Sequence, residues 1–134
     1  MTLEQVKNKW SGIQTCWKEG CYFFTLLTIL DELGIQYDMH AITRFAIDNS
    51  YIKANGYVLE PLLFLKAATG KRFTMMTVQT LPASIKNNQY TIEKWYNADT
   101  GYTHFRRRFV DTLIDSLTVK NGKLSCYYIF TCED

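Results

Sequence analysis

The sequence predicts an α+β domain in which helices come first and an antiparallel β-sheet follows. Segments with helical periodicity occupy the first half of the chain, and runs of β-branched and aromatic residues occupy the second half. No Pro/Gly-rich or low-complexity linker separates the two halves. The 134 residues are 47% hydrophobic and 15% aromatic, which is enough apolar material for one buried core. We therefore expect a single domain over residues 1–134.

Helices are predicted over residues 2–10, 21–33, 38–48 and 60–69. Thr2 and Gln5 resemble a capping box at the start of the first helix, and a loop over residues 11–20 follows that helix. Gly34 and Gly70 stand just past the second and fourth helices, where a left-handed residue commonly ends a helix. Pro61 suits the first turn of the fourth helix, because that position needs no backbone N–H.

Strands are predicted over residues 72–78, 90–96, 102–108, 110–115 and 124–131. Residues 97–101 have the composition of a turn, and Asn121-Gly122 marks a hairpin-like turn before the last strand. Pro82 predicts a turn after the first strand, with a brief helical turn over residues 81–87. Helices followed by these strands favour an antiparallel sheet beneath the helices.

The cysteine pattern argues against a metal centre. The four cysteines are Cys16, Cys21, Cys126 and Cys132, and no two of them form a CxxC pair. A zinc site is therefore poorly supported, and we expect no metal and no cofactor. A core of this size and a start without a signal peptide favour free thiols over disulfides. Cys126 and Cys132 have the same parity in the last predicted strand, so a regular strand places them on one face.

Charge and hydropathy exclude several kinds of partner. The net charge of +2 is too small to indicate nucleic acid binding, and the Arg106–Arg108 run predicts a solvated surface. The opening MTLEQVKNKW lacks the pattern of a secretory signal, and the apolar run Cys21–Leu30 is too short to span a bilayer. We therefore expect a cytoplasmic protein without a membrane partner. His40 is expected at the surface.

Cys21 and His104 are the residues best suited to chemistry. Cys21 opens the predicted helix over residues 21–33, and His104 lies far downstream in a predicted strand. A cysteine attacks as its thiolate, and both a helix N-terminus and a nearby imidazolium lower the thiol pKa. Gly20 leaves room for a substrate carbonyl beside the sulfur. His104 would take the thiol proton and later protonate the leaving group.

Two further groups complete this hypothesis. Asp115 is the preferred residue to orient the imidazole, because the stretch after His104 is long enough for a strand, a turn and a return strand. Asp111 and Asp99 are the alternatives. The backbone N–H of Cys21 and the side-chain amide of Gln14 would form the oxyanion hole.

The segments IQTCWKEGCYFFTLL, GYTHF and LIDSL together resemble the papain-like (clan CA) cysteine peptidase superfamily. The compact members are the most similar, namely the double-glycine leader peptidases and small phage and bacterial thiol hydrolases. The resemblance implies that Gln14, Cys21, His104 and Asp115 hold the positions of the family's oxyanion glutamine, nucleophile, histidine and orienting residue. The spacing from Gln14 to Cys21 is one residue longer than usual, and three arginines follow Phe105 where the family has an apolar strand.

The resemblance implies a small papain-like cysteine hydrolase of peptidase or amidase type, acting on a peptide or protein. The alternative is a catalytically inactive papain-like scaffold, phage-encoded, that binds or inhibits a partner protein. We expect Trp17, Gly20 and Tyr102 to contact substrate. The aromatic residues that could line a groove are Trp10, Trp17, Tyr51, Tyr57, Trp95, Tyr96 and Tyr102.

Overall fold

A computed structural model of the chain describes residues 21–99, 101–109, 112–115 and 122–133, with the backbone alone for Tyr102, Arg108, Phe109 and residues 112–115. The described helices are α3 (Cys21–Glu32), α4 (Met39–Asp48) and α5 (Pro61–Thr69). The described strands are β1 (Phe73–Val78), β2 (Gln89–Asn97), β3 (Tyr102–Phe109), β4 (Thr112–Asp115) and β5 (Lys123–Cys132). The α+β prediction is confirmed. The helix expected over residues 2–10, the loop over 11–20 and Asn121 lie outside the described residues.

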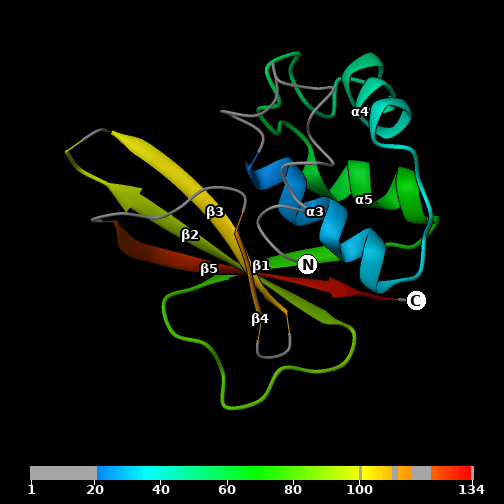
Figure 1. Cartoon of the computed structure of the whole chain (residues 1–134). Coiled ribbons are helices and arrows are strands. Elements are labelled where there is room, and N and C mark those ends of the chain that lie inside the picture. Colours follow the sequence, from blue (N-terminus) through cyan, green and yellow to red (C-terminus); the bar gives the residue numbers. More distant parts are fainter. Residues whose placement is uncertain (1–20, 100, 110–111, 116–121, 134) are drawn as a thin grey trace.

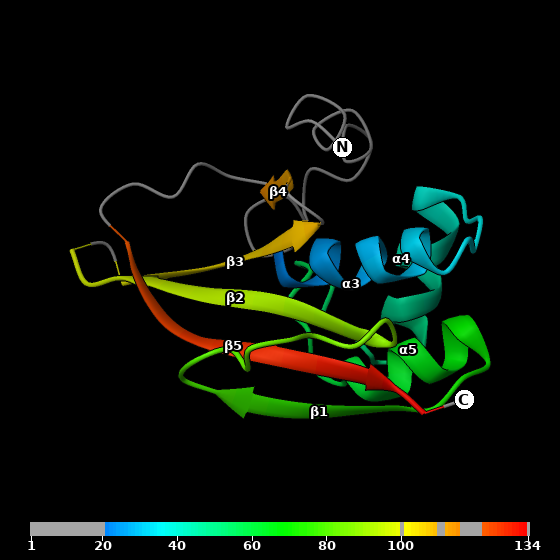
Figure 2. The same ribbon diagram turned by 90° about the horizontal axis from the view of Figure 1, so that it is seen from below.

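The strands form one antiparallel sheet in the order β1-β5-β2-β3-β4. The last strand of the chain therefore lies between β1 and β2, and β2 is in the middle of the sheet. The helices gather on one side of this sheet, with α3 against β3 and α5 against β1 (Figures 1 and 2). The C-terminal end of β5 lies beside the start of β1, where the Glu133 N–H donates to the Arg72 carbonyl.

Helix α3 is the centre of the core. All of its residues from Phe23 to Leu30 are buried, so the helix is enclosed on every side rather than along the single stripe expected from its spacing. Its two buried threonines remain compatible with an apolar surrounding because each bonds within the helix. The Thr25 hydroxyl donates to the Tyr22 carbonyl, and the Thr28 hydroxyl donates to the Thr25 carbonyl. Around α3 lie Phe64 and Leu65 of α5 and the inward side chains of the sheet.

The predicted helix ends are confirmed. Gly34 has φ +76° and forms a Schellman motif after α3, in which the Ile35 N–H donates to Leu30 and the Gly34 N–H donates to Asp31. Gly70 has φ +73° and its N–H donates to the Lys66 carbonyl at the end of α5. Pro61 occupies the first turn of α5, as its missing N–H allows.

Strand parity decides which side chains face the helices. In β5 the buried residues Cys126, Phe130 and Cys132 share the helix-facing side, which confirms the predicted common face of the two cysteines. The three described cysteines, Cys21, Cys126 and Cys132, are buried and are not joined to one another by disulfides. Cys16 lies outside the described residues.

Two predictions are wrong. Residues 81–87 form no helical turn: Ile85 is 37% exposed, and Lys86 and Gln89 instead bond to each other across a non-helical bend. The arginine run is not simply a solvated surface, because Arg107 is only 3% exposed.

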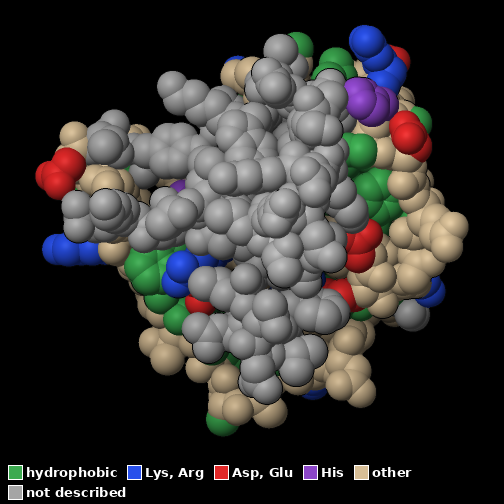
Figure 3. Space-filling model, in the orientation of Figure 1, with side chains coloured by type: hydrophobic (Ala, Val, Ile, Leu, Met, Phe, Trp, Pro, Cys, Tyr) green, Lys and Arg blue, Asp and Glu red, His purple; other side chains and the backbone are tan. Residues whose placement is uncertain are grey.

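Basic and acidic side chains lie beside each other around the rim of the face in Figure 3, where the described residues are visible. His40 is exposed, as predicted.

None of the described helices is long and apolar enough to cross a lipid bilayer.

Candidate functional site

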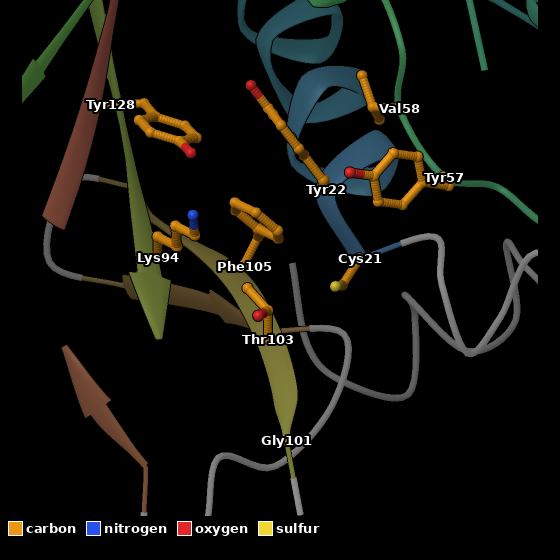
Figure 4. Close-up of a pocket in the computed structure, with 9 residues that line it drawn as sticks. All are labelled: Cys21, Tyr22, Tyr57, Val58, Lys94, Gly101, Thr103, Phe105 and Tyr128. Atoms are coloured by element: carbon orange, nitrogen blue, oxygen red, sulfur yellow. The ribbon is translucent and has the colours of Figure 1, made fainter. Parts of the chain in front are cut away.

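Cys21 lines a pocket of about 360 Å³ between the start of α3 and the helix-facing side of the sheet. Figure 4 shows the sulfur at one side of this pocket and the strand residues at the other. The described lining residues are Cys21, Tyr22, Tyr57, Val58, Lys94, Gly101, Thr103, Phe105 and Tyr128. This volume lies within the range of natural small-ligand sites, which is about 300–1,000 Å³.

A tight turn between α4 and α5 supplies one wall of the pocket. Gly56 has φ +94°, and its N–H donates to the Lys53 carbonyl, while the Tyr57 N–H donates to the Asn55 side chain. This turn closes the chain back on itself and directs Tyr57 and Val58 to the pocket. Tyr57, one of the aromatic residues that could line a groove, lines this pocket.

Three rings form an aromatic wall, comprising Tyr22, Phe105 and Tyr128. Tyr22 of α3 stacks on Phe105 of β3 with centroids 4.4 Å apart, and Tyr128 of β5 lies 5.8 Å from Tyr22 and 6.0 Å from Phe105. Burial, with a smaller contribution from Tyr128, raises the pKa of Tyr22 well above its usual value. The Tyr22 hydroxyl therefore keeps its proton at neutral pH, and it donates to the Met75 sulfur at 3.9 Å.

His104 is not among the described residues that line this pocket. Its neighbours Thr103 and Phe105 both line it, and alternation along β3 places His104 on the opposite face of the sheet. There it pairs in register with Trp95 of β2, and it is only 4% exposed. The structure therefore brings Cys21 next to the β3 residues that flank His104, but it does not bring the imidazole into the pocket.

The face that carries His104 also carries a polar cluster. Glu93 accepts from the Trp95 indole at 3.0 Å and from the Arg106 guanidinium at 2.8 Å. The Arg106 guanidinium also lies over the Trp95 ring at 4.3 Å. Arg106 is thereby held against the sheet instead of extending into solvent.

The three candidate orienting residues have different places. Asp115 lies in β4 opposite Arg106 of β3, two positions along the strand from His104. Asp99 is exposed in the turn after β2, where its N–H donates to the Asn97 side chain. Asp111 lies outside the described residues.

Gln14, Trp17 and Gly20 also lie outside the described residues, and Tyr102 is the first residue of β3. Within the described residues, no group of three or more His, Cys, Asp or Glu side chains could hold a metal ion.

Arg107 ties the far end of α3 to the sheet. Its guanidinium forms an ion pair with Glu32, donates to the Thr28 hydroxyl at 3.1 Å and lies over the Tyr90 ring at 5.4 Å. Burial lowers the pKa of Arg107, and Glu32 opposes that shift. Burial raises the pKa of Glu32, and Arg107 opposes that shift too. Burial thus acts against the charged form of both partners, and the ion pair acts in favour of it.

No protein-family model matches the sequence, and no curated protein or solved structure matches it significantly.

The sequence prediction missed most of the pocket. Tyr22, Lys94, Phe105 and Tyr128 were not singled out, although one signal pointed to Tyr22. Tyr22 follows the candidate nucleophile directly.

Proposed function

We propose that this chain is a small papain-like thiol hydrolase, of peptidase or amidase type, in which Cys21 is the nucleophile. The observation that carries the proposal is that Cys21, a residue of α3, borders a pocket of about 360 Å³. The proposal requires that the sulfur attack as a thiolate, the form of a cysteine that is nucleophilic. The pocket could bind the part of the substrate that lies beside the scissile bond.

In this proposal His104 is the general base and acid, Asp115 orients it, and Gln14 with the Cys21 N–H binds the oxyanion. His104 lies in the strand that borders the pocket, but Thr103 and Phe105 on either side of it line the pocket, so its own side chain is on the other face of the sheet. The register places Asp115 on the neighbouring strand. The proposal requires that substrate binding turns the start of β3 so that the imidazole leaves Trp95 and reaches the sulfur.

A second candidate function is a papain-like scaffold without catalytic activity that binds or inhibits another protein. The observation that favours it is the register pairing of His104 with Trp95, on the face of β3 that does not border the pocket. Cys21 would then be a packed helix residue, which its 4% exposure allows.

Site-resolved alkylation separates the two functions. The cysteines would be alkylated at a series of pH values from about 4 to about 9, and each rate would be read by mass spectrometry. An activated Cys21 should react at least about tenfold faster at pH ~6 than an ordinary thiol, whose pKa is about 8.5, and His104→Ala should abolish that advantage.

His40→Ala is the matched control, because it removes an exposed imidazole. It should leave the rate at Cys21 unchanged. If Cys21 of the wild type reacts only with the pH profile of an ordinary thiol, the hydrolase proposal is wrong and the binding function remains. Far-UV circular dichroism of both variants verifies that they fold.

A further inference from the structure

The described lining residues of the pocket beside Cys21 carry an unbalanced charge. Lys94 is the charged residue among its described lining residues, and neither Asp nor Glu is among them. The remaining polar side chains include the hydroxyls of Tyr57, Tyr128 and Thr103, which can donate hydrogen bonds to an anion, whereas the Tyr22 hydroxyl donates to Met75. The described lining thus places hydroxyl groups around one cation.

The surroundings of Lys94 differ from those of the arginines on the same part of the sheet. Arg106 is paired with Glu93 and Arg107 is paired with Glu32. Lys94 lies in β2 with Phe105 and Cys126 as its neighbours on the adjacent strands, and neither carries a carboxylate. Its described partner is the ring of Tyr128, whose centroid is 5.9 Å from the ammonium nitrogen.

Lys94 is half-buried, and an aromatic ring compensates its charge less well than a carboxylate would. An anion that enters the pocket would supply that missing charge. The aromatic wall would at the same time give an apolar surface to the carbon atoms that carry the anion. In Figure 4, Lys94, Phe105 and Tyr128 extend from the strands, whereas Tyr22 and Cys21 extend from α3, so a ligand that fills the pocket would lie between Lys94 and Cys21.

We infer that the pocket recognises a carboxylate, and that the substrate of the proposed hydrolase presents an acidic group to Lys94 while its scissile bond lies at Cys21. This inference rests on the proposed function only in so far as it calls the bound carboxylate compound a substrate. The binding of a carboxylate can be tested without it. The carboxylate can come from an acidic side chain or from the end of a peptide chain, and the pocket chemistry is the same for both.

The first test compares two alkylating reagents of similar size, iodoacetate and iodoacetamide, at Cys21. The ratio of their rates, normalised to the ratio for glutathione, reports the preference of the pocket for an anion. We expect a normalised ratio of about ten in the wild type, a ratio near one in Lys94→Gln, and a retained preference in Lys94→Arg. Lys66→Gln is the matched control, since Lys66 is exposed on α5 and does not line the pocket.

The second measurement does not need a reactive thiol. The backbone amides of Phe105 and Tyr128 would be followed by NMR during titration with N-acetylglutamate methylamide, N-acetylalanine and N-acetylglutamine methylamide. The first compound carries a side-chain carboxylate, the second a terminal carboxylate and the third neither. We expect saturable shifts with at least one of the anionic compounds, no saturation with the neutral one, and loss of binding in Lys94→Gln.

The outcomes separate this inference from the proposed function. An activated Cys21 without preference for iodoacetate, and without saturable shifts, overturns the carboxylate site and leaves the hydrolase standing. Saturable, Lys94-dependent binding with an ordinary thiol at Cys21 supports the carboxylate site and removes the hydrolase. A thermal melt of Lys94→Gln that matches the wild type confirms that any lost binding is local.

Discussion

Phe64 of α5 packs against α3, the helix that carries Cys21. Substitution of Phe64 therefore tests how much this helix packing stabilises the fold. Its side chain is fully buried in α5 and meets the ring of Phe23 in α3 edge-on, with centroids 5.1 Å apart. A second ring contact, at 6.3 Å, joins it to Tyr51 in the loop after α4. Phe64 therefore connects α3, α5 and that loop.

Phe64→Ala removes most of a phenyl ring from a closed core and leaves a cavity. Truncation of a buried Phe costs about 3–5 kcal/mol, and the two aromatic contacts favour the upper part of that range. For a domain whose total stability is about 5–15 kcal/mol, this is a large fraction. Phe64→Leu keeps most of the volume and should cost about 1–1.5 kcal/mol.

The free energy of unfolding would be measured by urea denaturation, with Leu63→Ala as the matched control. Leu63 is the preceding residue of the same helix and is 52% exposed, so its truncation should cost about 0.5 kcal/mol or less beyond any change in helix propensity. If Phe64→Ala costs no more than Leu63→Ala, the packing assigned here to α3 and α5 is wrong. An unchanged m-value would show that the loss is in the folded state.

Two further predictions concern electrostatics. The folded-state pKa of Glu32 is raised above 4.5 by burial, so the folded state binds this proton more tightly and the free energy of unfolding falls as the pH rises from about 4.5 through the folded pKa. Arg107→Met removes the cation that opposes this shift in the Glu32 pKa. Denaturant titrations at a series of pH values should therefore show that the free energy of unfolding falls more steeply with pH than in the wild type. An equal or shallower fall contradicts the ion pair between Arg107 and Glu32. Asp38→Ala removes the side-chain cap that accepts the Ala41 N–H at 2.9 Å at the start of α4 and should cost about 1 kcal/mol in thermal or urea unfolding. Asp38→Asn retains the acceptor and should cost less than half as much, and equal costs for the two variants would show that the cap bond contributes nothing.

Sequence reasoning was accurate where local chemistry decides the structure. Gly34 and Gly70 adopt the left-handed conformation that ends a helix, and Pro61 occupies a first turn. Each of these preferences depends on a few adjacent residues. The predicted turn over residues 81–87 failed for the corresponding reason, since so short a helix needs tertiary packing to offset its nucleation and Ile85 is left partly exposed.

The residue types of the candidate site were predictable from the sequence. The face of the sheet on which each side chain lies was not. Cys21 lies in α3 and lines the pocket, but β3 carries polar or charged residues at both parities. Its sequence therefore gives no periodic signal to say whether His104 or Phe105 faces the helices. The pairing with β2 and the stacking of Phe105 on Tyr22 decide this, and they place Phe105 in the pocket.

The sequence by itself determined the order of helices and strands and where most of them begin and end, because those depend on backbone preferences of neighbouring residues. Only the tertiary structure decided the strand order, with β5 between β1 and β2, and the burial of Arg107 against Glu32. Both depend on contacts between residues far apart in the chain. An arginine can leave water only where a distant carboxylate, hydroxyl and ring are already in place, and no local pattern encodes that arrangement.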